Sequence, residues 1–264
     1  MNTPANYTEA FAEWQAKRLA ALKAPNGWLN IIGRFWLEDG TVTVGTAPDN
    51  DLVLSAGPEH VGSLTQDDAG VKFTPADGSA PFQLQLNKAK PPQFTVGSLL
   101  LEVTTLNGEN ALRVRDTAST APAKLGEIDQ FPLDPNWRIV AQWIKLDTPQ
   151  GLTVDTTKSI PTDVQVTHKA IFDHDGTTYE LLPTHGTLEA PQFVLRDLTS
   201  RDSTYQASRF LYGEDVGTDT IVLDFNKAIN PPCAFTEHAV CPLPLPENVL
   251  PFRIEAGEKR LTGH

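Results

Sequence analysis

The spacing of turn-forming residues is the feature that most constrains the fold of this chain. From Trp28 onward, short runs of nearly alternating apolar and polar residues are broken, roughly every eight to twelve residues, by Gly, Asn, Asp or Pro. Asp39-Gly40, Asn107-Gly108 and Asp175-Gly176 suit tight hairpins because they tolerate positive φ. This pattern predicts antiparallel β structure. The expected strands include residues 41–44, 82–86, 99–103, 111–115, 137–144, 163–167, 192–196, 209–212 and 220–225.

One segment, from Tyr7 to Lys23, has helical periodicity instead. Its apolar residues fall on one arc at about 100° per residue, and they are Tyr7, Phe11, Trp14, Leu19 and Leu22. The other face is polar, and Pro25-Asn26-Gly27 ends the run. We therefore expect one N-terminal amphipathic helix that packs its aromatic stripe on a sheet.

These patterns predict a mainly β fold, an antiparallel sandwich or barrel with one N-terminal helix. The 264 residues lie just above the size at which single cores stop growing. Small polar residues from Asp116 to Ala123 are typical of a linker. We expect the helix within residues 1–26, a sandwich-like half in residues 27–118, and a barrel-like half in residues 119–264 that is closed by a proline-rich loop.

The charge balance narrows the range of partners. The chain has 21 Lys and Arg against 33 Asp and Glu, a net charge of −12, which opposes binding to nucleic acid or to an anionic membrane. No apolar run approaches the ~18 residues that span a bilayer, and the first residues do not form a secretion signal. We therefore expect a cytoplasmic protein without a nucleic-acid or membrane partner.

The chain lacks three common catalytic motifs. It has no G-x-S-x-G elbow, no G-x-x-x-x-G-K-[ST] phosphate loop and no H-E-x-x-H. Serine hydrolases of that type, phosphate-loop enzymes and zincins are therefore excluded, and the sequence specifies no cofactor.

A proline-rich segment follows the last predicted strand. Six of the 21 prolines lie from Pro231 to Pro251. Because proline fixes φ and supplies no N–H, this segment is neither helix nor central strand. We expect an extended, rigid loop that holds Asn230, Cys233, Thr236 and Asn248 in fixed directions.

The only two cysteines, Cys233 and Cys241, lie in this segment and allow three interpretations. With His238 and Glu237 or Glu247 they could bind zinc, but paired C-x-x-C or H-x-x-x-H arms are missing. They could also form a disulfide, which the cytosol disfavours. We favour two reduced thiols that serve as small buried side chains, and we expect no metal.

Charged and amide side chains concentrate in the last third of the chain. Arginine grips carboxylate or phosphate in bidentate fashion. We predict a pocket for a small anionic molecule, with Asp224 or Glu258 as acid or base. Its ligand-binding residues would be Arg196, Tyr205, Arg209, Asn226, Asn230 and Lys259.

The alternative interpretation of the same charges is a structural ion-pair network. It would pair Arg196 with Asp197 or Glu258, and Arg209 with Asp224. In that case the chain would need no ligand.

The last third also carries a set of motifs in a fixed order. They are Arg196-Asp197-Leu198-Thr199, Thr204-Tyr205, Arg209-Phe210-Leu211-Tyr212, Asp224-Phe225-Asn226-Lys227-Ala228, Asn230-Pro231-Pro232-Cys233-Ala234-Phe235-Thr236, Cys241-Pro242-Leu243-Pro244 and Glu255-Ala256-Gly257-Glu258-Lys259. Together they resemble the bacterial and archaeal family known as domain of unknown function 1684. The resemblance implies a β-rich cytoplasmic protein and supplies no mechanism.

The N-terminal half offers an alternative function. The stretch from Val42 to Leu54 looks like the opening of forkhead-associated domains, which are β-sandwiches that bind phosphothreonine peptides. Thr46 lies where that family has a phosphate-binding arginine. The fold can therefore occur here without phosphopeptide binding. An interaction module of this kind and a structural protein without a ligand are therefore the alternatives to a small-molecule site.

Overall fold

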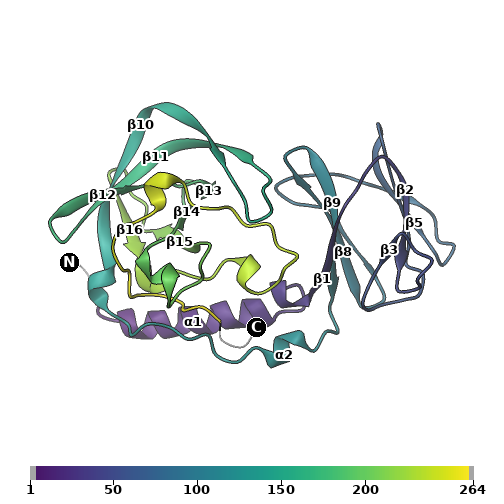
Figure 1. Cartoon of the computed structure of the whole chain (residues 1–264), viewed down its shortest axis with the longest axis horizontal. Helices are drawn as coiled ribbons and strands as arrows, with labels where there is room; N and C mark the ends of the chain where they lie inside the picture. The colour runs from purple at the N-terminus through teal and green to yellow at the C-terminus, as the bar shows by residue number, and fades with distance from the viewer. Residues whose placement is uncertain (1–3, 262–264) are drawn as a thin grey trace. The chain divides into compact units, whose positions relative to one another are not determined.

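The computed structural model describes residues 4–261 and separates into two compact units. The C-terminal unit combines the chain up to Leu19 with the chain from Glu127 onward, and the N-terminal unit is Ala20–Gly126 (Figure 1). The chain is mainly β, as predicted, with the expected helix α1 at Tyr7–Lys23. Within residues 4–261, no helix has both the length and the apolar character needed to cross a membrane. The domain limits at residues 26 and 118 stay a prediction.

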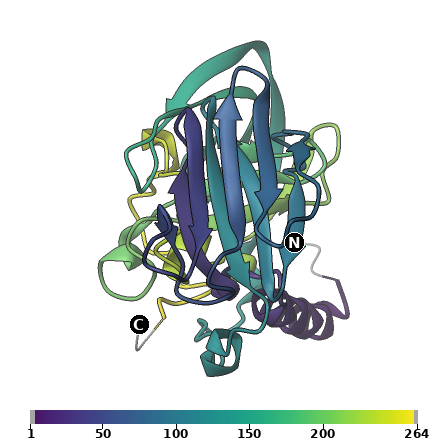
Figure 2. The same ribbon diagram turned by 90° about the vertical axis from the view of Figure 1, so that its right-hand side faces the viewer.

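The N-terminal unit is a sandwich of two sheets. The four-stranded sheet has the order β1 (Ile31–Trp36), β9 (Glu109–Asp116), β8 (Leu99–Leu106), β7 (Gln93–Val96). The five-stranded sheet, which faces the viewer in Figure 2, has the order β3 (Leu52–Val53), β2 (Gly40–Gly45), β4 (Gly62–Asp67), β5 (Gly70–Pro75), β6 (Phe82–Leu84). Val44 and Phe73 from one sheet pack with Leu101 and Leu112 from the other in a single core. A short helix, α2 (Ala121–Lys124), lies in the predicted linker.

The C-terminal unit is built on one seven-stranded antiparallel sheet. Its order is β12 (Thr177–Leu181), β11 (Thr162–His174), β10 (Arg138–Val154), β16 (Thr220–Asp224), β15 (Arg209–Glu214), β14 (Pro191–Leu195), β13 (His185–Gly186). The edge strands β12 and β13 do not pair with each other, so this half has no closed barrel and the barrel expectation is corrected to an open sheet.

The hairpin turns follow the chemistry of their residues. Asn107 and Gly108, between β8 and β9, have φ values of 51° and 85°. Asp175 and Gly176, between β11 and β12, have φ values of 48° and 74°. Two consecutive residues with positive φ match the twist of an antiparallel pair, which is why Asn-Gly and Asp-Gly mark these positions in the sequence.

The chain after β16 covers the open sheet with irregular structure. Leu250, Ile254 and Ala256 join the core formed by the sheet, and the segment is the yellow strand-free path of Figure 1. Packing by this segment replaces the contacts that barrel closure would provide. The unit's short 3-10 turns are η2 (Pro135–Trp137), η3 (Leu198–Arg201), η4 (Phe225–Lys227), η5 (Pro232–Ala234) and η6 (Pro246–Asn248), while η1 (Trp28–Asn30) belongs to the N-terminal unit.

Asn248 fixes the proline-rich segment to the sheet. Its side-chain oxygen accepts from the Leu182 N–H at 2.8 Å, and its side-chain nitrogen donates to the carbonyls of Leu182 and Val194, each at 2.9 Å. The side chain is fully buried. An amide that replaces backbone partners in this way holds a strand-free chain against β14, because buried backbone groups must be paired.

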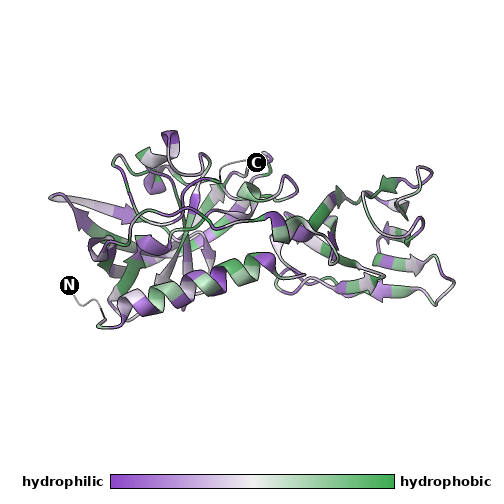
Figure 3. Ribbon diagram, turned by 90° about the horizontal axis from the view of Figure 1, so that it is seen from below, coloured by the Kyte–Doolittle hydropathy of each residue, from purple (hydrophilic) through white to green (hydrophobic). Residues whose placement is uncertain are grey.

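Helix α1 contributes aromatic side chains to the C-terminal unit. Tyr7 and Phe11 are both 6% exposed, and the ring of Phe11 stacks on that of Trp14 with centroids 5.6 Å apart. Hydrophobic and hydrophilic residues alternate along the helix in Figure 3, as expected for a helix with one packed face.

Candidate functional site

The most deeply buried cation of the C-terminal unit is Arg209, at the start of β15. Its side chain forms an ion pair with Asp197 and donates to the carbonyls of Ala256 at 2.5 Å and Ile254 at 3.2 Å. Asp197 also accepts from the N–H and hydroxyl of Thr199, at 2.6 and 2.5 Å. Burial lowers the pKa of Arg209, and the Asp197 carboxylate opposes that shift. Arg209 therefore fastens the C-terminal segment to the sheet.

Asp224, the first predicted acid or base, lies fully buried at the end of β16. The hydroxyl of Tyr7 lies 2.9 Å from both of its oxygens. The side-chain amide of Asn226 donates to Asp224 at 3.2 Å, to the Tyr7 hydroxyl at 3.1 Å and to the carbonyl of Asp134 at 2.8 Å. Burial and the neighbouring carboxylate raise the pKa of Tyr7, so its hydroxyl stays a donor. This network attaches α1 to the sheet.

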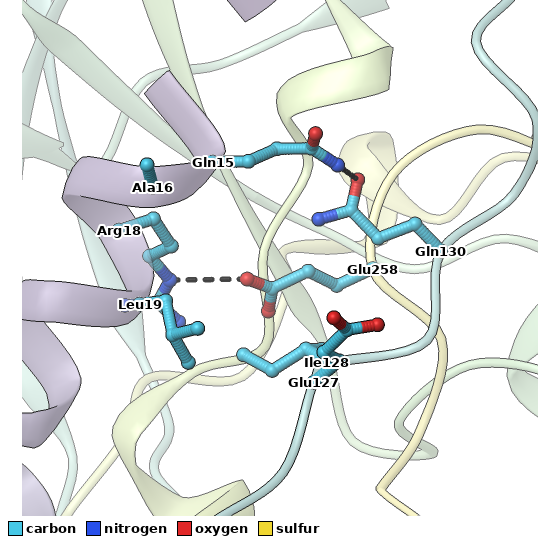
Figure 4. A pocket seen from close by; sticks show the side chains of 8 residues that line it. All are labelled: Gln15, Ala16, Arg18, Leu19, Glu127, Ile128, Gln130 and Glu258. Carbon is cyan, nitrogen blue, oxygen red and sulfur yellow. Dashed lines mark hydrogen bonds and ion pairs between the residues drawn. The ribbon is translucent and has the colours of Figure 1, made fainter. Parts of the chain in front are cut away.

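Glu258, the second predicted acid or base, is also fully buried. One oxygen accepts from Nε of Arg18 at 3.0 Å (Figure 4). The other oxygen accepts from the backbone N–H of Asn230 at 2.6 Å. Nη2 of Arg18 donates to the carbonyl of Asn230 at 3.0 Å, and the guanidinium lies over the ring of Phe235. Arg18 thus links α1 to residues on both sides of the proline-rich segment, Asn230 before it and Glu258 after it.

A pocket of about 270 Å³, the α1 pocket, opens beside this ion pair. Gln15 donates across it to Gln130 at 2.8 Å. Arg18 is already paired with Glu258, and Glu127 adds a second carboxylate. The lining of the α1 pocket therefore has a negative formal charge. This charge disfavours the binding of an anion in the α1 pocket. The lining residues, all labelled in Figure 4, are Gln15, Ala16, Arg18, Leu19, Glu127, Ile128, Gln130 and Glu258.

A second pocket, the Tyr205 pocket, has the opposite charge. It is also about 270 Å³ in volume and is lined by Ser200, Arg201, Thr204, Tyr205, Gln206, Ala234, Arg260 and Leu261. Its charged lining residues are two arginines, and the side-chain amide of Gln206 adds a neutral donor. The Tyr205 hydroxyl donates to the carbonyl of Cys233 at 3.3 Å. Its ring and the side chain of Leu261 give the pocket an apolar wall.

The acid nearest to this pocket along the chain, Asp202, is engaged elsewhere. Two nitrogens of Arg253 each donate to it at 3.0 Å. The hydrogen bonds from Arg253 and then Ser203 lower the pKa of Asp202 to about 2. Arg260 acts on this carboxylate only as a weaker, longer-range charge. Within residues 4–261, neither Arg201 nor Arg260 forms an ion pair.

The remaining predicted ligand-binding residues do not line either pocket. The side chain of Arg196 is exposed, and its backbone pairs with Asn248 and Leu250. Lys259 lies over the ring of Phe131 at 4.9 Å, and its carbonyl accepts from the Asn230 side chain at 2.8 Å. Of the eight predicted acid, base and ligand-binding residues, Glu258 lines the α1 pocket and Tyr205 lines the Tyr205 pocket, so the set does not surround either one.

The ion pairs differ from the pairing suggested by sequence. Arg209 binds Asp197 rather than Asp224, and Glu258 binds Arg18 rather than Arg196. Sequence reasoning missed Tyr7 and Arg18 because their partners lie 217 and 240 residues away, beyond any local pattern. It also missed Arg201 and Arg260. The sequence contained one indication for Arg201, because this residue lies two positions after the Arg196-Asp197-Leu198-Thr199 motif. In the structure it is the last residue of η3.

The two cysteines are not joined by a disulfide and lie close together. The backbone N–H of Cys233 donates to Sγ of Cys241 at 3.1 Å, and Cys241 is buried. The described part of the chain contains no cluster of three or more His, Cys, Asp or Glu residues that could hold a metal ion, so the zinc interpretation lacks a ligand set there.

The stretch from Val42 to Leu54, which looks like the opening of a forkhead-associated domain, contains a hydrogen-bonded aspartate, Asp51. Asp51 accepts from both the N–H and the hydroxyl of Thr43, each at 2.8 Å. Thr46 follows β2, and its N–H donates to the carbonyl of Pro58 at 3.0 Å. The phosphopeptide-binding alternative stays a prediction, and a phosphothreonine peptide library that enriches no sequence would contradict it.

The fold and its charges define a mainly β protein whose C-terminal unit is an open sheet fastened by buried ion pairs. A family model described as "Protein of unknown function (DUF1684)" matches residues 123–259, and the chain belongs to this family. The match confirms the resemblance indicated by the motifs of the last third.

The chain is also similar to solved structures. The solution NMR structure of the uncharacterized protein from gene locus rrnAC0354 of Haloarcula marismortui shares 26% sequence identity with this chain, at a TM-score of 0.43. The similarity covers 53% of this chain and 79% of that one. No curated protein matches the chain.

Proposed function

We propose that this chain binds a small anionic molecule in the Tyr205 pocket of its C-terminal unit. The observation that carries the proposal is the sign of the charged lining, which consists of Arg201 and Arg260 without an acid. The whole chain has a net charge of −12 and therefore repels anions at long range. A locally positive pocket on a chain of negative net charge supports selective binding of an anion at that pocket.

Arg201 and Arg260 remain able to bind an anion because Arg253 forms the ion pair with the nearby carboxylate of Asp202. Its two contacts with Asp202 form a fork-to-carboxylate pair. Arg201 and Arg260 can each present planar donors to a carboxylate or phosphate group. Gln206 adds a neutral side-chain donor to the same lining. The Ser200 hydroxyl already donates to the carbonyl of Asp197 at 2.8 Å, and the Thr204 hydroxyl is paired with that of Thr199 at 2.9 Å.

The pocket also limits the size and role of the ligand. Its volume of about 270 Å³ suits a molecule smaller than a typical drug. Because the Tyr205 hydroxyl donates to Cys233, the ring rather than the hydroxyl faces a ligand as an apolar surface. Neither Asp224 nor Glu258 lines this pocket, so the proposed function is binding rather than catalysis.

The test is calorimetric titration of the full chain with inorganic phosphate and with citrate at constant ionic strength. We expect the double variant R201A/R260A to bind the better of the two anions at least about tenfold more weakly, a loss of about 1.4 kcal/mol or more. R196A is the matched control because it removes an exposed arginine outside the pocket.

Three outcomes would overturn the proposal. One is that neither anion binds the parent chain. The second is that R201A/R260A binds as tightly as the parent. The third is that R196A weakens binding as much as the double variant, which would show a general charge effect rather than a site.

A further inference from the structure

The two cysteines form a pair of adjacent thiols inside the proline-rich segment. Sγ of Cys241 lies 3.1 Å from the backbone nitrogen of Cys233. That nitrogen is three bonds from the Cys233 sulfur, so the two thiols lie close together. The sequence separates them by only seven residues, which makes the loop between them short.

The backbone around both cysteines is fixed before any reaction. The N–H of Cys241 donates to the hydroxyl of Thr157 at 3.2 Å, and the N–H of Thr157 donates to the Cys241 carbonyl at 2.8 Å. Cys233 lies in the η5 turn, and its carbonyl accepts from Tyr205 at 3.3 Å. Pro232 and Pro242 each restrict the chain next to a cysteine. The thiols are therefore held close with little freedom to separate.

The two thiols differ in access and in acidity. Cys233 is half-buried, whereas Cys241 is 1% exposed. The hydrogen bond from Cys241 lowers the pKa of Cys233 in spite of burial, and the same hydrogen bond with burial raises the pKa of Cys241. Since the thiolate is the nucleophile, Cys233 is the thiol that reacts first.

We propose that Cys233 and Cys241 form a reversible intramolecular disulfide by exchange with a small-molecule disulfide. The Cys233 thiolate attacks one sulfur of the external disulfide, so that an S–S bond forms at Cys233 and one external thiolate leaves. Cys241 then loses its proton and attacks the Cys233 sulfur, which releases the second external thiolate. The chain loses two protons and two electrons, and the external disulfide, whose S–S bond breaks, takes them up and becomes two thiols.

This exchange goes beyond anion binding and would place the bond beside the Tyr205 pocket. Cys233 directly precedes Ala234, which lines that pocket. The disulfide would close the loop of residues 233–241 without requiring a change in the sheet.

The test uses the reduced full chain in buffers of glutathione disulfide and glutathione, followed by acid quenching, alkylation and intact mass measurement. We expect the parent to lose two hydrogens and to contain no alkylatable thiol at the oxidising end, and to recover both thiols in excess glutathione. A parent chain that accumulates one or two stable glutathione adducts, or remains fully reduced, would overturn the proposal.

Two single variants test the order of the steps. C241S should stop at one glutathione adduct on Cys233, while C233S should react at least about tenfold more slowly, because Cys241 is buried and less acidic. In denaturing urea the two variants should react at similar rates, which shows that the fold creates the difference. Equal rates in the folded variants would contradict the assignment of Cys233 as the attacking thiol.

Discussion

Arg209 and the pair Arg201 and Arg260 carry the same charged group within one unit, but their surroundings differ completely. Arg209 is 1% exposed, and its guanidinium donates to Asp197 and to two carbonyls. Arg201 and Arg260 are exposed and line a pocket that contains no acid. A buried charge must be satisfied by the protein itself, whereas a charge at a pocket keeps donors for a ligand. In this chain, the deepest charges stabilise the fold and the shallower ones are proposed to recognise a ligand.

The two pockets show the same division. In the α1 pocket, Arg18 donates to the Glu258 carboxylate and to the Asn230 carbonyl. These contacts join α1 to residues that flank the proline-rich segment. In the Tyr205 pocket, the competing acid Asp202 is held by Arg253. Pockets of equal volume therefore differ in the ligand that their charges favour.

The largest expected effect comes from breaking the buried ion pair. Asp197→Ala leaves Arg209 buried without its carboxylate, so we expect the free energy of unfolding to fall by about 3–5 kcal/mol. Urea denaturation followed by tryptophan fluorescence measures this loss. R196A is the control and should change stability by no more than about 0.5 kcal/mol. An Asp197→Ala midpoint equal to that of the parent would contradict a structural role for Arg209.

A smaller effect is expected at the junction of α1 and the sheet. Tyr7→Phe removes the hydroxyl that lies 2.9 Å from both oxygens of Asp224, at an expected cost of about 1–3 kcal/mol. The hydrogen bond from Asn226 and the ion pair with Lys227, at 3.8 Å, remain, so the carboxylate keeps two side-chain partners. The midpoint of urea denaturation again measures the change.

The same variant predicts a change in alkaline stability. Burial first, and then Asp224, raise the pKa of Tyr7 above its ordinary value of about 10. The unfolded chain thus loses this proton at a lower pH than the folded chain. The resulting stabilisation is complete below about pH 10 and is lost as the pH rises beyond it. Tyr7→Phe should lose less stability than the parent between about pH 9 and pH 11, and an equal loss would contradict this role.

The sequence predicted local structure well because local structure follows from neighbouring residues. The alternating runs became strands, the Asn107-Gly108 and Asp175-Gly176 dipeptides became positive-φ turns, and the apolar arc of Tyr7–Lys23 became α1. The proline-rich segment formed no strand longer than an isolated bridge.

The candidate site was harder to predict because it depends on which charges meet. The motifs identified Arg209, Asp224 and Glu258 as important polar residues, and the structure buries all three next to dedicated partners. Those partners include Tyr7 and Arg18, whose pairing spans most of the chain. Tyr205, a predicted ligand-binding residue, lines the pocket that is proposed to bind an anion. The two arginines beside it, Arg201 and Arg260, are brought together by the tertiary contacts between η3 and the C-terminal end of the chain, which no local pattern predicts.

The most direct measurement of anion binding at the Tyr205 pocket is a crystal structure of the full chain grown with selenate, a tetrahedral dianion that anomalous scattering locates. We predict a selenium peak within hydrogen-bond distance of Arg201 and Arg260 in the parent, and its loss in R201A/R260A crystals. Selenium peaks confined to lattice contacts or to the α1 pocket, or a peak that persists in the double variant, would contradict the proposed site.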